Sequence, residues 1–275
     1  MARDRVDGTD VAELAAQLLR LVAAEDWDGI ERLRDSAAAD GWRVALHLAQ
    51  RIREEERGSR AARRVAGVDL ARGGWAVVVL EDDRVVDAFR CESFADALLV
   101  EAEVIGVDIP VGIPEHGMRP ADQAARRFVG PRASSVFTTA VRPVLEAETY
   151  AEARAVATEL TGKSISAQAY ALRRRILEVD EYAHADERVL EVHPEVSFRE
   201  LAHRALLSKH RTDGLAERRT LLEQAGIEVP ETVARIAEPD LLDATVVAWT
   251  ARRYALGEAV PLPEGHAERI GAIWR

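Results

Sequence analysis

The chain contains 275 residues, enough for one large domain or for one domain with a smaller appended unit. Hydrophobic residues make up 48% of it and charged residues 31%, which is ordinary for a globular protein with a buried core. The formal net charge of −11 argues against a protein that holds long nucleic acid by bulk electrostatics alone, although a local basic groove is compatible with it.

Cysteine content and hydropathy limit the classes further. The single cysteine, Cys91, excludes an intrachain disulfide framework and any zinc site with several thiolate ligands. No apolar run approaches the ~20 residues of a membrane span, and the N-terminus lacks the apolar region of a secretory signal. We therefore expect a soluble, cytoplasmic protein with no membrane partner.

Residues 1–60 differ in character from the rest of the chain. Apolar residues at helical spacing predict helices over residues 11–22, around residues 30–33 and over residues 42–52, with no strand pattern. The highly charged run 53–60 predicts the end of a helix and a linker. We interpret residues 1–60 as a helical appendage that serves packing or the docking of a protein partner.

The pattern changes to strands at Val65. Three apolar segments separated by tight turns predict three antiparallel strands, at residues 65–70, 75–80 and 84–89. Ser93 and Asp96 resemble a capping box, which predicts a helix to about Glu103. The apolar segment 104–109 then predicts a buried strand, and its approach through a helix favours parallel pairing.

The remaining sequence is mainly helical. We expect a helical insertion over about residues 120–187, then a short strand over residues 188–193. The individual helices are expected at residues 122–129, 149–160, 166–179, 198–207, 215–225 and 241–256. Residues 61–275 are therefore predicted to form one α/β domain with a mixed sheet flanked by helices.

Two aspartates follow apolar strands in similar settings. Asp69 stands in Gly67-Val68-Asp69-Leu70, and Asp108 stands in Gly106-Val107-Asp108-Ile109-Pro110. Ligands gather at the carboxyl ends of parallel strands, and a carboxylate there is costly unless something pairs with it. Either aspartate alone could cap a turn, but the two together favour a functional site.

Further acids occur near the C-terminal half of the domain. Asp240 and Asp243 lie three residues apart in the first turn of an expected helix, on one face, where the helix dipole by itself also favours acids. Glu195 follows the strand that ends at His193 and is a candidate metal-facing acid. His193 is a candidate proton carrier or supporting hydrogen-bond donor, although an isolated histidine is more often structural.

Such a group of carboxylates is typical of a divalent-metal site. Mutual repulsion between the acids is removed by a cation, and oxygen ligands alone suit Mg²⁺ or Mn²⁺. Two such ions can activate water and stabilise the leaving oxygen of a phosphodiester. The candidate catalytic residues are Asp69, Asp108, Asp240, Asp243 and Glu195, with the four aspartates as metal ligands.

Basic residues between the acidic segments are candidates for binding phosphate. Arg126, Arg127 and Arg132 follow soon after Asp108, and arginine forks hold phosphate oxygens in pairs, although solvated helix faces also carry such residues. The candidate phosphate-binding set is completed by His193 and Lys209. Aromatic residues are only 5% of the chain, so no regular series for base stacking is present.

Several short segments occur together in a specific order. They are Gly67-Val68-Asp69 before Gly74-Trp75, Asp108-Ile109-Pro110-Val111-Gly112, Asp122 with Arg126-Arg127 and Gly130, Phe137, Glu191-Val192-His193-Pro194-Glu195, Ser208-Lys209, Gly214 with Arg218, and Asp240 to Ala244. This combination resembles the DUF429 family, described as predicted nucleases of the ribonuclease H fold. The resemblance covers about residues 64–275 and leaves out the N-terminal helical unit.

The resemblance implies a ribonuclease H-like fold, in which acids on the first strand, the fourth strand and a late helix bind the metals. These positions correspond to Asp69, Asp108 and Asp243, with Asp240 as the added acid of a pair like that of Holliday-junction resolvases. The implied activity is that of a metal-dependent nuclease using Mg²⁺ or Mn²⁺ on a nucleic acid or a nucleotide-like phosphodiester. Fold likeness implies activity only weakly.

Two other functions remain open at this point. The domain could be a non-catalytic binding module whose acids cap turns and pair with bases, which the net charge of −11 suits well. Alternatively, Asp69-Leu70-Ala71-Arg72-Gly73-Gly74 loosely resembles the first phosphate loop of actin-like ATP-dependent phosphotransferases, although a second such loop is missing.

Overall fold

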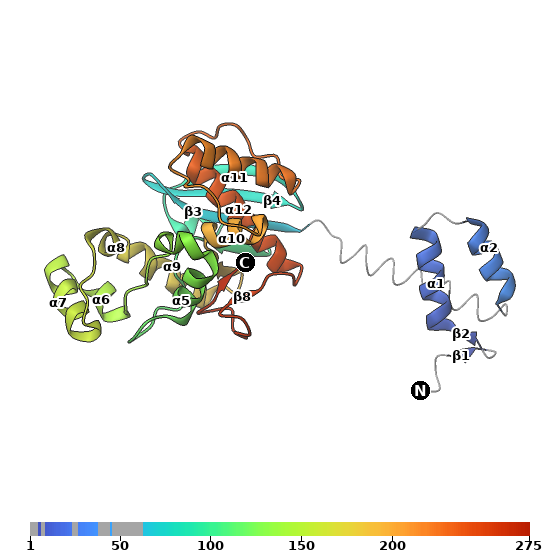
Figure 1. Cartoon of the computed structure of the whole chain (residues 1–275), viewed down its shortest axis with the longest axis horizontal. Helices are drawn as coiled ribbons and strands as arrows, with labels where there is room; N and C mark the ends of the chain where they lie inside the picture. Colours follow the sequence, from blue (N-terminus) through green and yellow to red (C-terminus); the bar gives the residue numbers. More distant parts are fainter. Residues whose placement is uncertain (1–4, 7–8, 24–26, 38–44, 46–62) are drawn as a thin grey trace. The chain divides into compact units, whose positions relative to one another are not determined.

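The computed structural model describes residues 5–6, 9–23, 27–37, 45 and 63–275 (Figure 1). The chain divides into two compact units, Met1–Ala61 and Ala62–Arg275. No helix in the described part of the chain has the length and apolar character needed to cross a lipid bilayer.

The N-terminal unit contains two of the expected helices. They are α1 (Val11–Ala23) and α2 (Trp27–Ser36), and Leu14 and Leu18 of α1 are buried in a small apolar cluster. A two-residue strand pair, β1 (Arg5–Val6) and β2 (Thr9–Asp10), precedes them, which the sequence pattern does not predict. The expected third helix and the linker lie outside the described residues, apart from the buried, helical Ala45.

The second unit is built on a five-stranded mixed sheet, as predicted. Its strands are β3 (Arg64–Ala71), β4 (Gly74–Glu81), β5 (Arg84–Cys91), β6 (Val104–Val107) and β7 (Val189–Glu191). Their order across the sheet is β5-β4-β3-β6-β7. The first three strands are antiparallel neighbours, whereas β3, β6 and β7 run parallel, so the predicted change of direction after the third strand is confirmed.

Helices fill the connections between the strands. Between β5 and β6 lies α4 (Phe94–Ala97); between β6 and β7 lie α5 (Pro120–Val129), the 3-10 helix η1 (Gly130–Ser135), α6 (Arg142–Glu146), α7 (Tyr150–Thr161), α8 (Ala167–Ala171) and α9 (Arg173–Ala185). After β7 follow α10 (Pro194–Ala202), α11 (Thr212–Gln224), α12 (Glu238–Ala255) and a small hairpin of β8 (Pro261–Leu262) and β9 (Ile273–Trp274). The expected helical insertion is therefore present.

Three helix predictions were wrong in extent. The helix expected over residues 198–207 begins and ends earlier, as α10 (Pro194–Ala202). The capping box of Ser93 and Asp96 forms as expected, but α4 ends at Ala97 rather than near Glu103. By Glu103 the chain has already joined the sheet, where the Glu103 N–H bonds to Arg64 O at 2.9 Å. The helix expected over residues 166–179 is divided into α8 and α9 at Leu172.

The two faces of the sheet are covered by different helices (Figure 1). One face packs its alternating residues, such as Val65 and Val78, against α10, α11 and α12. The other face, with Val68 and Val77, packs against α4 and α9. Because side chains alternate along a strand, Gly67 and Asp69 lie on the same face as Val65, the face covered by α12.

The helix α12 is packed unusually close to β3. A Cβ atom at Gly67 would lie 2.0 Å from the backbone O of Ala244 and 2.3 Å from the backbone N of Ala248. Every residue of α12 from Leu241 to Ala251 is buried, so this helix is enclosed on all sides rather than along one stripe. The missing side chain at Gly67 therefore sets the distance between the helix and the sheet.

We expect Gly67→Ala to lower the free energy of unfolding by about 3 kcal/mol or more, because the added methyl group meets helix backbone that cannot yield without moving α12. Urea unfolding followed by circular dichroism measures the change. Gly257→Ala is the control, since Gly257 has φ +73° but open space around it, and should cost only about 1 kcal/mol. Equal losses for the two variants would contradict the close approach.

Candidate functional site

Three aspartates from distant parts of the sequence lie together at one end of the sheet. Asp69 belongs to β3, Asp108 directly follows β6, and Asp243 lies in the N-terminal part of α12. Each of Asp69 and Asp108 feels the charge of Asp243, and the two strand aspartates also interact with each other. The structure thus brings the two strand aspartates that the sequence singled out together with Asp243 of the later Asp240/Asp243 pair.

The sheet register explains why the two strand aspartates are neighbours. Val68 of β3 and Val107 of β6 are partners in the parallel pair, and Asp108 donates its backbone N–H to Val68 O at 2.9 Å. Asp69 is therefore opposite Asp108 across the strand pair. Both continue the alternation that faces α12, which places them beneath the turn carrying Asp243.

The carboxyl groups of the aspartates have too few positively charged neighbours to balance their negative charge. Burial is the largest cause that raises the pKa of Asp69 well above its usual value, and the charges of Asp108 and Asp243 raise it further. Burial also raises the pKa of Asp108, against a lowering influence of His193. The pKa of Asp240, one turn away on α12, is raised by burial and then by Asp243. The site therefore favours protons or cations.

Lys209 is the side chain that most directly offsets this negative charge. Its Nζ lies 2.5 Å from Oδ2 of Asp243, whose side chain is 2% exposed. Burial alone would lower the pKa of Lys209, but Asp243, Asp108 and Asp69 together outweigh burial and raise it. The lysine therefore stays charged and serves as the internal counterion of the aspartates, whereas the sequence placed it at a substrate phosphate.

Lys209 is carried by a loop between α10 and α11 (residues 203–211), here called the lysine loop. This loop packs so closely on the start of α11 that a Cβ at Gly214 would lie 2.1 Å from Ser208 O. The buried Arg218 donates from Nη1 to Leu207 O at 2.8 Å, and Glu217 accepts the Leu207 N–H at 2.8 Å. These bonds hold the loop so that Lys209 reaches Asp243.

Glu195 does not join the aspartates. Its Oε2 accepts a hydrogen bond from Arg218 Nη2 at 2.8 Å, and its Oε1 accepts one from Arg132 Nε at 3.1 Å. Both oxygens are engaged by arginine, so the expectation that Glu195 faces a metal is not met in the structure. Glu195 instead orients Arg218, which in turn holds the lysine loop. Arg132 is held at Glu195.

The other candidate phosphate-binding residues divide into two groups. His193 caps α10 through Nδ1, which accepts the Glu195 N–H at 3.2 Å, and its electrostatic influence lowers the pKa of Asp108. Arg126 instead donates to the backbone O of Val136, and Arg127 lies exposed on α5. Among the charges described, neither arginine is a leading influence on Asp69 or Asp108.

A second buried ionic group fixes the chain after Asp108. The sequence named Asp122 and Glu191 only as part of the DUF429 resemblance and did not pair them with Arg119. Arg119, 3% exposed, pairs with Glu191 through both carboxylate oxygens and donates from Nε to Asp122 Oδ1 at 2.9 Å. It also donates to Val111 O at 2.8 Å. Glu191 pairs in register with Val107 and alternates away from the α12 face, so it stays apart from the aspartates.

The donor set was tested against the metal ions that the sequence suggests. In the described part of the chain, no three His, Cys, Asp or Glu side chains are already arranged to hold one ion, and Lys209 bonds to Asp243 instead. The chemistry nevertheless fits Mg²⁺ or Mn²⁺, because the donors are carboxylate oxygens and the raised pKa values of Asp69 and Asp108 show uncompensated negative charge. A metal ion could bind Asp243 only if the contact between Lys209 Nζ and Asp243 Oδ2 breaks.

Comparison with known proteins identifies the family of the chain. Residues 67–268 match the model of a family described as protein of unknown function (DUF429), which is well over half of the sequence. This chain belongs to the DUF429 family. No curated protein and no solved structure matches it. The DUF429 match contains all four aspartates, His193 and Lys209, and it leaves out the N-terminal unit.

We expect Asp69→Asn to stabilise this DUF429 protein by about 1 kcal/mol at pH 7 to 8 without divalent metal, because the amide removes a buried charge. The folded-state pKa of Asp69 is raised, so protonated Asp69 stabilises the unchanged protein at low pH, and this stabilisation is lost as the pH rises through the folded pKa. The advantage of Asp69→Asn over the unchanged protein should therefore disappear as the pH falls toward ~4, where Asp69 is protonated. Urea unfolding at several pH values measures it.

The matched control is Asp87→Asn on the exposed side of β5, which should change stability little at any pH. A loss of stability in Asp69→Asn at pH 8 would contradict the inferred shortage of positive charge.

We expect Lys209→Met to lower the free energy of unfolding by about 1–2 kcal/mol at pH 7, since it leaves the buried Asp243 unpaired while the lysine itself is 37% exposed. The double variant Lys209→Met/Asp243→Asn should recover most of this loss, because it removes both charges together. A double-mutant cycle in urea measures the coupling. If the stability losses of the two single variants simply add in the double variant, Lys209 and Asp243 do not interact.

Proposed function

We propose that this DUF429 domain is a metal-dependent hydrolase of phosphodiester bonds, with Asp69, Asp108 and Asp243 as its central acids. The observation that carries the proposal is the convergence of these three carboxyls from β3, β6 and α12, with the pKa values of both strand aspartates raised. Buried acids with perturbed pKa values occur mainly at functional sites.

The topology supports the proposal. The strand order β5-β4-β3-β6-β7, with three antiparallel strands followed by parallel ones, is the order expected for a ribonuclease H-like domain. The DUF429 resemblance implies acids on the first strand of the sheet, at its fourth strand and on a late helix. Asp69 lies on β3, Asp108 follows β6 and Asp243 lies on α12. The proposed nuclease activity rests on this placement together with the charge of the site.

The side chains at the site would have distinct tasks. Asp69, Asp108 and Asp243 would hold Mg²⁺ or Mn²⁺, with Asp240 next to them on α12. A divalent cation bound there would supply an activated water and charge stabilisation of the leaving oxygen. Lys209, freed from Asp243, is placed to contact a phosphate oxygen. His193 accepts a hydrogen bond at Nδ1, so its Nε2 is the atom that carries a proton beside Asp108.

One observation favours a second function, that of a non-catalytic binding module. Lys209 already bonds to Asp243, and the described acids form no ready-made metal site. In that case the lysine is a permanent structural counterion, and the aspartates have no catalytic role. The two functions differ in their response to metal ions, because an ion that binds the folded state stabilises it by mass action.

The test combines thermal unfolding with cleavage of fluorescent DNA and RNA, both single-stranded and structured. We expect Mn²⁺ or Mg²⁺ to raise the melting temperature of the full chain and to support cleavage. Asp69→Asn should abolish the metal-dependent rise and lower cleavage by at least about 100-fold. Asp87→Asn, a charge change of the same kind on the exposed side of β5, should behave like the unchanged protein.

Each result separates the two candidate functions. Metal stabilisation with cleavage, both lost in Asp69→Asn, supports the hydrolase. A melting temperature that ignores both ions, with no cleavage of any substrate, supports the non-catalytic module.

A further inference from the structure

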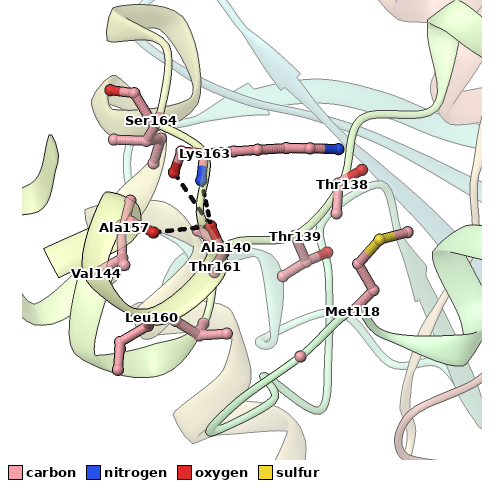
Figure 2. A pocket seen from close by; sticks show the side chains of 13 residues that line it. Met118, Thr138, Thr139, Ala140, Val144, Ala157, Leu160, Thr161, Lys163 and Ser164 are labelled. Carbon is pink, nitrogen blue, oxygen red and sulfur yellow. Dashed lines mark hydrogen bonds between the residues drawn. The ribbon is translucent and has the colours of Figure 1, made fainter.

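A cavity of about 410 Å³ lies in the helical insertion, apart from the aspartates (Figure 2). Its walls come from the segment before α5, the segment that leads into α6, the helices α6 and α7, and the loop after α7. None of Asp69, Asp108 and Asp243 lines it. A cavity of this size accommodates a small organic molecule.

The interior of the cavity is apolar. Val144 of α6, Ala157 of α7 and Ile165 are buried members of a separate apolar cluster of the insertion. Met118 and Leu160 line the same cavity but are 51% and 48% exposed. Two large apolar side chains left in water beside an apolar cavity favour a ligand that covers them.

Lys163 gives the cavity its charge. Among the thirteen residues that line it, Lys163 is the charged one, and no Asp or Glu is present. Figure 2 shows its side chain extended along the cavity toward Thr138. Within the described residues no carboxylate lies within ion-pair distance of its Nζ, in contrast to Lys209.

The backbone of Lys163 is fixed, although its ammonium group is not paired. Thr161 Oγ1 donates to Ala157 O at 2.7 Å and to Lys163 O at 3.1 Å, and it accepts the Lys163 N–H at 3.3 Å (Figure 2). Beside it, Ser164 Oγ accepts from Arg154 Nε at 3.2 Å, which leaves the serine hydroxyl proton free to donate. The loop therefore presents an ammonium group and hydroxyls from an ordered backbone.

We propose that this cavity binds an amphipathic monoanion, a small molecule with an apolar ring or short chain and one carboxylate or similar oxyanion. The apolar part fills the space between Val144, Ala157 and Ile165 and covers Met118 and Leu160. The oxyanion meets Lys163 and the hydroxyl of Thr138. This site is independent of the proposed hydrolase activity, because the two share no residue.

Charge and shape decide the ligand class. A cationic ligand would find no carboxylate among the lining residues, and a neutral apolar ligand would leave the Lys163 ammonium group unused. A ligand with several phosphates would place most of its charge against apolar walls. One negative charge on an apolar body is the chemistry that satisfies both parts of the site.

The experiment uses the full chain and two fluorescent probes with nearly the same apolar body. The anionic probe is 8-anilino-1-naphthalenesulfonate, and the neutral one is N-phenyl-1-naphthylamine. Lys163→Ala removes the charge, and Leu160→Gln removes part of the apolar wall. Their matched controls are Arg174→Ala and Leu99→Gln, which change exposed residues of similar kinds outside the cavity. Near-ultraviolet circular dichroism confirms that each variant is folded.

We expect the anionic probe to bind saturably at one site. Lys163→Ala should weaken that binding by about tenfold and leave the neutral probe unaffected, since only the charged hydrogen bond is lost. Leu160→Gln should weaken both probes, and the control variants should weaken neither. Binding of the anionic probe that is not saturable, or that responds equally to Lys163→Ala and Arg174→Ala, overturns the proposal. So does an equal response to Leu160→Gln and Leu99→Gln.

Discussion

The close contact of α12 with β3 over Gly67 is the constraint on which the site depends. Without a side chain at Gly67, the backbone of the helix at Ala244 lies directly on the strand. Asp243 precedes Ala244 and Asp69 follows Gly67 on the same face, so this contact also sets the distance between two acids of the site. The contact between Gly67 and the backbone of α12 therefore determines both the packing of the helix on the sheet and the placement of the acids.

The second constraint is electrostatic. Four aspartates gather at this end of the sheet, and the described basic side chains that influence them most are Lys209 and His193. Neither side chain removes the raised pKa values of Asp69 and Asp108. The folded protein therefore holds negative charge in excess at a buried place, a cost that the packing of α12, buried from Leu241 to Ala251, has to offset.

The strands and the strand aspartates could be predicted from the sequence, because both depend on local patterns. Alternation and tight turns located β3 to β5, and Asp69 and Asp108 stand out as acids within or directly after apolar runs. Glu195 could not be assigned correctly, because the arginine that binds it, Arg218, lies on another helix. Lys209 was singled out, but its partner, Asp243, is 34 positions away in the sequence. Partners of buried charges are decided by tertiary packing rather than by neighbouring residues.

The hydrogen bonds of Arg218 link the two basic side chains that lie nearest to the aspartates. Arg218 holds the lysine loop through Leu207 O and holds Glu195, whose backbone N–H bonds to His193. Both basic side chains near the aspartates are thus anchored to a single guanidinium group. Replacing Arg218 would release both anchors at once, so one substitution would disturb the positions of Lys209 and His193 together.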